Sequence, residues 1–292
     1  MRNRDFAGHD NLSRKSKKHD NVRSSNIRSD KAVRRPPRYP FGLILFILLP
    51  FFFLAGFWPS AKCATQAPDG DGILRRIDEN IGADNKISTS EMIIRGRRAT
   101  RTIRSRSWIR GRTESFTEYL APPREEGTKM LKLEDQLWTY TPSSDRTILI
   151  SGHMLRQSLM GSDLSYEDMM EDPRLAVLYD ATVTGEEDFE GRPCWVLDLV
   201  SKGEEIAYYS RKIWVDKERY VALKENRYAK SGKLLKTTEV KEVVREEGRW
   251  VPKRVVFKDV LKEGEGTEFI IESIEFNADI PETLFTKASL KR

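Results

Sequence analysis

The stretch LMGSDLSYEDMM, residues 159–170, decides the fold, because nearly everything after residue 71 is predicted to be strand and this piece is not. Ser165 suits the N-cap of a short helix, and Asp168 three residues later completes a carboxylate variant of the capping box. Leu164 before the cap and Met169 after it can form a hydrophobic staple. Because so short a helix is not stable alone, we predict that it rests on the inside of a curved sheet.

Strands are predicted on both sides of this stretch. From residue 86 onward, short segments rich in β-branched and aromatic residues alternate with turn signals, which is the pattern of an antiparallel meander. Residues 151–176 lack a clean strand, so we expect them to form a long excursion that covers the sheet. The predicted strands lie near residues 87–96, 99–110, 113–120, 128–133, 136–141, 146–150, 177–188, 194–200, 206–215, 220–229, 234–245, 250–258 and 267–276.

An amphipathic helix is predicted at the start of this region, over residues 71–82. Its apolar side chains recur at spacings of one, three and four residues, and Gly82 can end it. The stripe consists of Ile73, Leu74, Ile77 and Ile81. The expected fold is therefore mainly β, with an N-terminal helix and a short helical lid.

Positive charge is concentrated at the N-terminus. Residues 1–40 contain 12 Lys or Arg and 4 Asp or Glu, whereas the whole chain has a net charge of +6, so residues 41–292 are slightly acidic. The first 40 residues cannot bury enough apolar surface to fold, and we predict a disordered, basic, cytoplasmic tail. Aromatic residues are scarce among the basic ones and a hydrophobic segment follows directly, so no nucleic-acid partner is expected.

Residues 41–58, FGLILFILLPFFFLAGFW, carry no charge. They follow Arg34, Arg35 and Arg38, so the positive-inside rule keeps the N-terminus in the cytoplasm and exports what comes after. The 18 residues, with Pro50 among them, form either the hydrophobic region of a signal peptide or a membrane anchor of about 27 Å at about 1.5 Å per residue. The sequence is compatible with both.

A linker, residues 59–70, is predicted to join this segment to one folded domain, residues 71–292. Ala61 and Cys63 place small residues where a signal peptidase would need them. Lipidation of Cys63 is not favoured, because Lys62 stands where a lipidation signal needs a small residue. The chain has two cysteines, which do not indicate a disulfide framework.

Catalysis and metal binding have little support in the sequence. After the hydrophobic segment the chain has one histidine, His153, so an envelope hydrolase would have to pair it with Asp163 or Ser162, and the G-x-S-x-G motif is absent. Zinc sites of the usual kinds need several His or Cys ligands, and this part of the chain has too few of them. An acidic cluster could bind calcium, but helix capping explains it better. That cluster consists of Asp163, Glu167, Asp168, Glu171 and Asp172. We expect no enzyme activity, cofactor or metal.

Aromatic and sulfur-containing side chains are the candidates for a binding site. Trp138 and Tyr140 share a face of one predicted strand, and Trp195, Leu197 and Leu199 share a face of another. A sheet this long must curl, and beyond about eight strands its interior exceeds what side chains easily fill. The spacing of these residues is compatible with a ligand cavity and equally with a packed core. The candidate cavity and lid residues are Trp108, Phe116, Trp138, Tyr140, Met154, Met160, Leu164, Tyr166, Met169, Met170, Trp195, Leu197 and Leu199.

Three motifs resemble the bacterial outer membrane lipoprotein-sorting protein family, relatives of the periplasmic lipoprotein carrier LolA. They are FTEYLAPPREEG at 116–127, LWTYTP at 137–142 and MGSDLSYED at 160–168. The resemblance covers about residues 71–292. It implies a half-open antiparallel β-barrel over a helical lid, an apolar cavity for acyl chains, and an association with transporters of the RND/MMPL type.

The expected function is that of an exported, non-enzymatic carrier of lipids or lipoprotein acyl chains in the periplasm. Residues 41–58 would either be cleaved or tether the carrier to the inner membrane. An RND/MMPL-type transporter in the inner membrane is the expected protein partner. The alternatives are a structural adaptor for such a transporter, which would hold no ligand, and the envelope hydrolase described above.

Overall fold

The computed structural model describes residues 69–96, 99–203 and 206–292. The predicted basic tail, the hydrophobic segment 41–58 and most of the linker lie outside these residues, so the proposed boundaries 1–40, 41–58 and 59–70 stay predictions. Among the helices that the structure describes, none is long and apolar enough to cross a bilayer.

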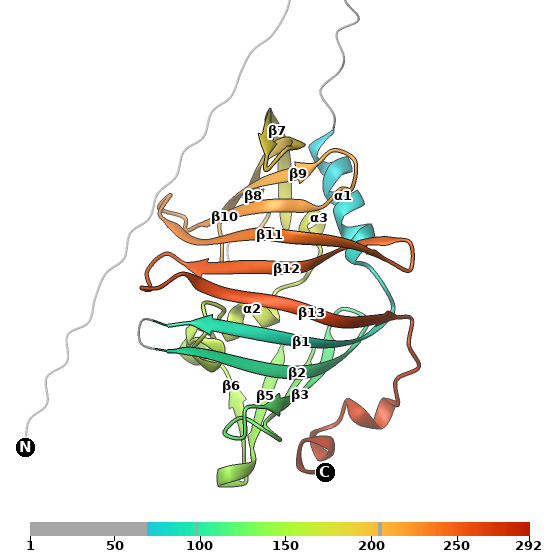
Figure 1. The fold of residues 1–292 in the computed structure, drawn as a ribbon, viewed down its shortest axis with the longest axis vertical. Coiled ribbons are helices and arrows are strands. Elements are labelled where there is room, and N and C mark those ends of the chain that lie inside the picture. Colours follow the sequence, from blue (N-terminus) through green and yellow to red (C-terminus); the bar gives the residue numbers. More distant parts are fainter. Residues whose placement is uncertain (1–68, 97–98, 204–205) are drawn as a thin grey trace, which may run out of the picture. The chain divides into compact units, whose positions relative to one another are not determined.

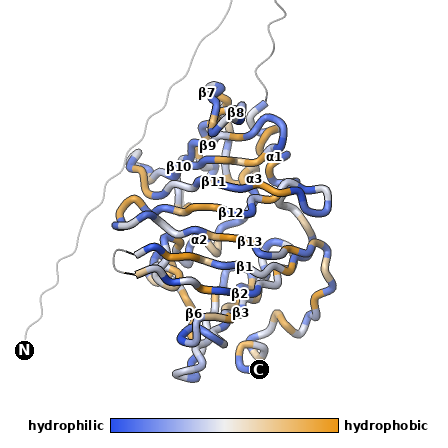
Figure 2. The backbone as a smooth tube through the Cα atoms, viewed as in Figure 1, coloured by the Kyte–Doolittle hydropathy of each residue, from blue (hydrophilic) through white to orange (hydrophobic). Residues whose placement is uncertain are grey.

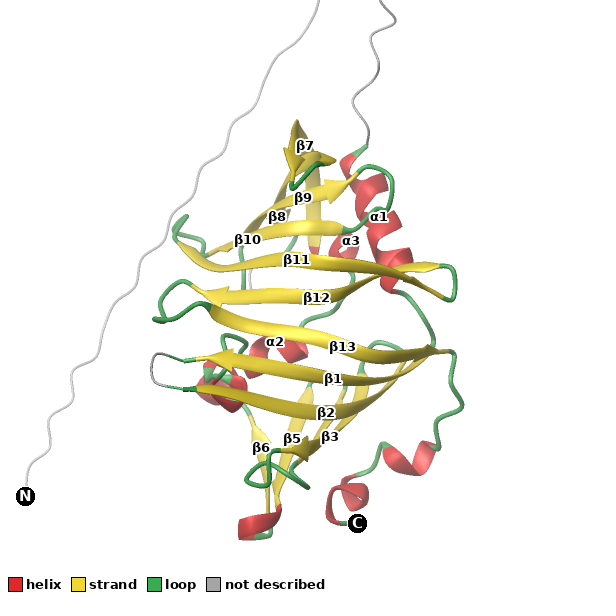
Figure 3. Ribbon diagram, viewed as in Figure 1, coloured by secondary structure: helices red, strands yellow, loops and turns green. Residues whose placement is uncertain are grey.

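The described residues form one antiparallel sheet of thirteen strands (Figures 1 and 3). All thirteen predicted strands are present. Their order in the sheet is β6-β5-β4-β3-β2-β1-β13-β12-β11-β10-β9-β8-β7. Their bounds are β1 Asn85–Arg95, β2 Thr100–Arg110, β3 Glu114–Ala121, β4 Lys129–Leu133, β5 Gln136–Thr141, β6 Arg146–Ile150, β7 Tyr179–Phe189, β8 Arg192–Ser201, β9 Ser210–Asp216, β10 Ala222–Tyr228, β11 Leu234–Glu246, β12 Arg249–Asp259 and β13 Gly266–Phe276.

The sheet is open, because β6 and β7 lie at its two ends and are not paired with each other. Strands that are neighbours in the sheet are also consecutive in the chain, except at the central pairing of β1 with β13. Register shifts, as between Thr89 and Ser90 in β1, mark bulges that bend strands and help a long sheet to curl. The predicted mainly β, half-open antiparallel barrel is confirmed.

The chain between β6 and β7 must travel from one edge of the sheet to the other, and residues 151–178 do so. We call residues 151–178 the lid segment. It contains η2 (Gly152–Arg156), η3 (Leu159–Gly161), α2 (Tyr166–Met170) and α3 (Leu175–Leu178). The face of the sheet that contacts this segment is called the inner face.

Helix α1 (Gly70–Ile81) lies where the amphipathic pattern predicted a helix. Its buried stripe of Ile73, Leu74 and Ile77 packs on β7, β8 and β9. Asp78 of α1 accepts hydrogen bonds from the backbone N–H groups of Leu175 and Ala176, at 2.9 and 3.1 Å. These are the first residues of α3, so α1 holds the end of the lid segment against the sheet.

Apolar residues recur through the strands in both halves of the sheet (Figure 2), and they pack on both faces. On the outer face, a C-terminal segment with η4 (Glu282–Leu284) and η5 (Lys287–Lys291) covers strands β2 to β5. Its Ile280, Phe285 and Leu290 are buried there. A cover on each face explains why residues of both parities are apolar on these strands.

Candidate functional site

The capping box predicted from the sequence begins α2. The Ser165 hydroxyl accepts a hydrogen bond from the Asp168 N–H at 3.3 Å, and the Asp168 carboxylate accepts one from the Ser165 N–H at 2.6 Å. Just before it, Arg101 of β2 donates to the carbonyl of Met160, whose backbone is left-handed. The lid helix is therefore fixed both by its own sequence and by a strand of the sheet.

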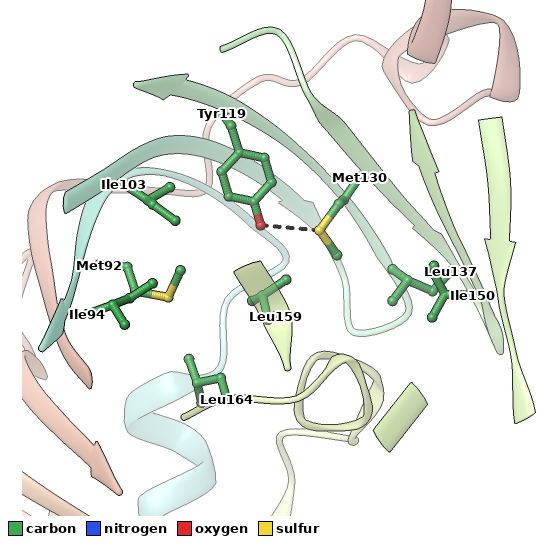
Figure 4. Packing of buried hydrophobic residues seen from close by; sticks show 9 residues of the cluster. All are labelled: Met92, Ile94, Ile103, Tyr119, Met130, Leu137, Ile150, Leu159 and Leu164. Atoms are coloured by element: carbon green, nitrogen blue, oxygen red, sulfur yellow. Dashed lines mark hydrogen bonds between the residues drawn. The ribbon is translucent and has the colours of Figure 1, made fainter. Parts of the chain in front are cut away.

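An apolar cluster lies between the lid segment and the inner face of the sheet (Figure 4). From the lid, Leu159 and Leu164 reach into it, and the Tyr119 hydroxyl donates to the sulfur of Met130 at 3.2 Å. Burial raises the pKa of Tyr119, so it stays neutral at physiological pH. The buried members are Met92, Ile94, Ile103, Tyr119, Met130, Leu137, Ile150, Leu159 and Leu164.

Beside this cluster lies a cavity of about 260 Å³. Two hydroxyl pairs form its polar side: Ser90 with Ser105 at 3.3 Å, and Ser107 with Thr117 at 2.9 Å. Its remaining walls combine apolar side chains with three charged ones. The lining consists of these four residues together with Met92, Ile103, Tyr119, Leu159, Leu164, Asp168, Met169, Glu171, Arg227, Phe257 and Phe269.

Charged contacts fasten α2 to the sheet. Asp168 accepts a hydrogen bond from the Tyr208 hydroxyl at 2.6 Å and forms ion pairs with Lys236 of β11 and, at 3.3 Å, with Arg227 of β10. Burial opposes ionisation of Asp168, but attraction to the two cations outweighs it and lowers the pKa of Asp168 to about 2. Asp168 is therefore a carboxylate at physiological pH.

A second carboxylate of the lid segment, that of Glu171 just after α2, pairs with Arg211 of β9. Between Arg211 and Arg227, Glu225 of β10 accepts from both, at 2.6 and 2.9 Å. Burial opposes the charge of Glu225 as well, yet the two guanidinium groups lower its pKa to about 2. Burial raises the pKa of Glu171, and repulsion by Glu225 and Asp168 adds to the rise.

The other end of α2 is held by Lys132 of β4. Its ammonium group donates to the carbonyls of Met169 and Met170 at 3.3 and 3.1 Å. The last carbonyls of a helix lack partners within the helix, so a cation there satisfies them. Burial lowers the pKa of Lys132.

Four members of the acidic cluster, Asp163, Asp168, Glu171 and Asp172, make structural contacts beyond capping. Asp163 accepts from the Thr267 hydroxyl at 2.8 Å and from the Asp259 N–H at 3.0 Å, and Asp172 pairs with Arg174 at 2.5 Å. Within the described part of the chain, no group of three or more His, Cys, Asp or Glu is placed to hold a metal ion.

The thirteen candidate residues fall into three groups, and the third is itself divided between two places. Met154, Met160, Leu164, Tyr166 and Met170 belong to the cluster under the lid segment. Met169 lines the cavity, with 37% of its surface exposed. The third group of the candidates packs elsewhere: Trp195, Leu197 and Leu199 under α1, and Trp108, Phe116, Trp138 and Tyr140 on the outer face.

We expected one cavity lined by all these aromatic residues, but their side chains lie on different faces of the sheet. On β2, Ile103, Ser105 and Ser107 face the cavity, so Trp108 points to the outer face, where it packs on Phe116 with ring centroids 5.8 Å apart. The sequence pattern identified which aromatic residues share a face. It could not show that the C-terminal segment, rather than the lid, covers that face.

The charged residues of the inner face were not predicted. Arg211, Arg227 and Lys236 contact the lid, Glu225 pairs with the two arginines, and the serines of β1 and β2 line the cavity. A signal was present in β10, whose sequence ALKENRY places polar residues on both faces. Because one face of this strand must lie toward the interior, polar residues on both faces indicate a polar patch there.

The hydrolase alternative is not supported by the site. His153 is exposed on η2, whereas Ser162 is fully buried and its hydroxyl is engaged with the backbone of Leu164. Asp163 is held by Thr267 and Asp259. A buried hydroxyl in a turn is not accessible to a substrate, so Ser162 is not a suitable nucleophile.

Comparison with known proteins gives one matching family model and several solved structures with a similar fold. A family model described as "Uncharacterized protein" matches residues 111–292. A DUF1329 family protein from Desulfovibrio piger is similar in structure, with 23% identity, a TM-score of 0.70, and coverage of 76% of this chain and 97% of that one. No curated protein sequence matches the chain.

Two further solved structures cover the same 76% of the chain. One is a putative outer membrane lipoprotein-sorting protein domain from Vibrio parahaemolyticus, with 25% identity, 98% of its length covered and a TM-score of 0.67. The other is a LolA superfamily protein from Nitrosomonas europaea, with 24% identity, its whole length covered and a TM-score of 0.64. The chain therefore belongs to the family whose model it matches over residues 111–292, and it has the LolA-like fold that its motifs predicted.

Proposed function

We propose that this protein is an exported carrier that binds acyl chains of lipids or lipoproteins between the lid segment and the inner face of the sheet. The observation that carries the proposal is the cavity under α2, lined by Met92, Ile103, Leu159, Phe257 and Phe269 together with its polar side. Each methylene buried from water contributes about 0.8 kcal/mol, so a chain of several carbons would be retained. The lipoprotein-sorting domain with the same fold supports this function.

With the lid in place, the cavity is small for an acyl chain. Its volume of about 260 Å³ is below the ~300–1,000 Å³ typical of ligand sites. Met92 and Met169 line it, and methionine side chains adapt to irregular ligands. Admission of a whole chain nevertheless requires α2 to move, which breaks its contacts to Lys132 and to the cations of β9 to β11. The lid segment would thus control entry and release.

The periplasm is the proposed place of action. Support comes from the sequence, where the basic tail and the apolar segment 41–58 indicate export, with cleavage and membrane tethering as the two alternatives. An inner-membrane transporter of the RND/MMPL type is the proposed partner that loads or unloads the carrier. That partner rests on the family resemblance alone.

The test compares two tryptophan variants of the full chain. Ser105→Trp places a large ring in the cavity, whereas Thr102→Trp places the same ring on the exposed outer face of the same strand. Each protein is purified from the cell envelope, and its extracted lipids are identified by mass spectrometry. Wild type and Thr102→Trp should carry acyl lipid, and Ser105→Trp should have lost most of it. A wild-type protein without lipid would instead fit the structural adaptor.

A further inference from the structure

Three cations stand side by side on the inner face, on three adjacent strands. Arg227 of β10 has two direct cross-strand partners, which are Arg211 of β9 and Lys236 of β11. We call these three residues the basic row. Like charges directly opposite each other in a sheet are destabilising, so this arrangement needs compensating anions. Arg211 is the most buried of the three, with 2% of its side chain exposed.

The compensating charge comes largely from the lid. Glu225 is the sheet carboxylate that pairs with the basic row, whereas Asp168 of α2 and Glu171 at its C-terminal end belong to the lid segment. With α2 in place, three cations face three carboxylates. Displacement of α2 removes two of those carboxylates and leaves the row with a net charge of +2. A charge that stays buried after it loses its partner is strongly destabilising, so a substitute anion would stabilise the opened lid.

Donor capacity remains even with the lid closed. The Nε atoms of Arg211 and Arg227 are buried, and within the described residues neither has a hydrogen-bond partner. Buried donors of this kind are rare and call for a ligand or water. A guanidinium group also matches the planar, two-oxygen geometry of a carboxylate or phosphate.

The basic row adjoins the proposed acyl site. Arg227 lines the cavity together with Met92 and Phe269. Lys236 lines a neighbouring pocket of about 410 Å³, to which Ser165 and Glu167 of the lid segment also contribute. Asp168 and Glu171 line the first cavity, so the start of α2 lies between the two spaces. A chain in the first cavity would have its polar end near the row once α2 is displaced.

We propose that Asp168 and Glu171 occupy an anion site, and that the cargo is an anionic amphiphile whose carboxylate or phosphate group takes their place on the basic row. This inference rests on the proposed function and deepens it by naming the class of cargo. The exchange keeps the row compensated while the lid is open. A neutral lipid of the same chain length would leave the row unpaired and bind more weakly.

The test measures a ratio of affinities on the purified full chain, freed of lipid. Titration calorimetry at pH 7 compares decanoate and decyl phosphate with neutral decanoylglycerol, and inorganic phosphate alone distinguishes a headgroup site from a free-anion site. A charged hydrogen bond contributes about 1.5–3 kcal/mol, so the anionic amphiphiles should bind at least about tenfold more tightly than the neutral one. Phosphate alone should bind much more weakly, because it gains nothing from the cavity.

Variants on the two sides of the contact should act in opposite directions. Lys236→Gln removes a cation of the row and should lower the anionic-to-neutral ratio several-fold. Glu171→Gln removes a competing lid carboxylate and should raise that ratio. Lys212→Gln deletes the same charge from β9 on the opposite face, where the lysine lies over Trp214, and should leave the ratio unchanged. Matched circular dichroism spectra would confirm that each variant folds.

The possible outcomes separate the two proposals. Equal affinities for anionic and neutral amphiphiles, or a ratio that Lys236→Gln leaves unchanged, would overturn the anion site while the carrier function stands. No binding of any amphiphile would overturn both. Tight binding of inorganic phosphate alone would mean that the row binds small anions, and this too would overturn the proposed cargo.

Discussion

The carboxylate of Asp168 accepts a hydrogen bond from the Tyr208 hydroxyl at 2.6 Å, while it also completes the capping box of its own helix. One side chain therefore starts α2 and fastens it to the chain that leads into β9. Capping alone would make Asp168 a local determinant of helix stability. The contact with Tyr208, together with the cations beside it, makes it a determinant of whether the lid is closed.

We predict that Asp168→Asn lowers the free energy of unfolding by about 2 kcal/mol at pH 7, because a pKa lowered from 3.8 to about 2 corresponds to that difference. The folded-state pKa is depressed, so this stabilisation is present above about pH 4 and is lost as the pH falls toward 2. Urea unfolding of both proteins at pH 7 and at about pH 2, the folded-state pKa, measures it. A difference that did not shrink with acid would contradict the assignment.

Glu171 should behave in the opposite way. Burial raises its pKa in the folded state, so its ionisation costs stability, and that cost appears as the pH rises through the raised pKa. Glu171→Gln should therefore lose less stability at pH 7 than Asp168→Asn does. Wild type should become less stable relative to Glu171→Gln as the pH rises from about 4, just below the ordinary glutamate pKa, to about 7. Urea unfolding across that range checks the sign. A relative gain by wild type would be the contrary result.

Lys132→Met should loosen the C-terminal end of the lid helix. The substitution keeps the buried stem but removes the hydrogen bonds to the carbonyls of Met169 and Met170, at a cost of about 1 kcal/mol. Hydrogen exchange followed by mass spectrometry should show faster exchange in residues 166–171, with the strands unchanged. Exchange rates equal to wild type in that peptide would show that Lys132 does not hold the lid.

The outer-face aromatic residues should matter for stability but not for ligand binding. Phe285→Ala removes a buried ring that the C-terminal segment packs among the outer-face aromatics, and such truncations cost about 3–5 kcal/mol. Because this cluster lies on the face away from the cavity, the lipid content per folded molecule should not change. Calorimetric unfolding and lipid extraction of the same sample measure both. Loss of lipid without loss of stability would place the ligand on the outer face.

Met169 and Glu167 offer a comparison within α2. Met169 lines the cavity despite its exposure, whereas Glu167 lines the pocket on the other side. Met169→Asp should therefore reduce retention of a bound fluorescent fatty acid more than Glu167→Ala does. The reverse order would favour the acidic residues of this helix as the ligand site.

The elements of the fold were largely predictable, because each follows from local chemistry. Alternation and turn residues marked the strands, and Ser165 with Asp168 marked the start of α2. One strand predicted from residue 206 begins only at Ser210. Tyr208 explains the difference, since its carbonyl accepts from the Tyr179 hydroxyl and its own hydroxyl bonds Asp168 in place of a strand partner.

The composition of the site was less predictable, because it depends on which distant segments meet. In the sequence, Arg211 and Lys236 look like ordinary surface charges on strands, and only the path of the lid segment shows that they contact it. The sequence likewise suggests that Trp138 lines a cavity, and only the structure shows that the C-terminal segment covers the face of the sheet on which it lies. In both cases period-two alternation gives the parity of a side chain but not the identity of what covers it.

The most direct test of the carrier is the lipid content of wild type, Ser105→Trp and Thr102→Trp purified side by side from the cell envelope. The account predicts acyl lipid in wild type and Thr102→Trp and its loss in Ser105→Trp, because Ser105 lines the cavity under α2 and Thr102 does not. Equal lipid in all three proteins would mean that the ligand binds elsewhere. Its absence from all three would contradict the carrier function itself.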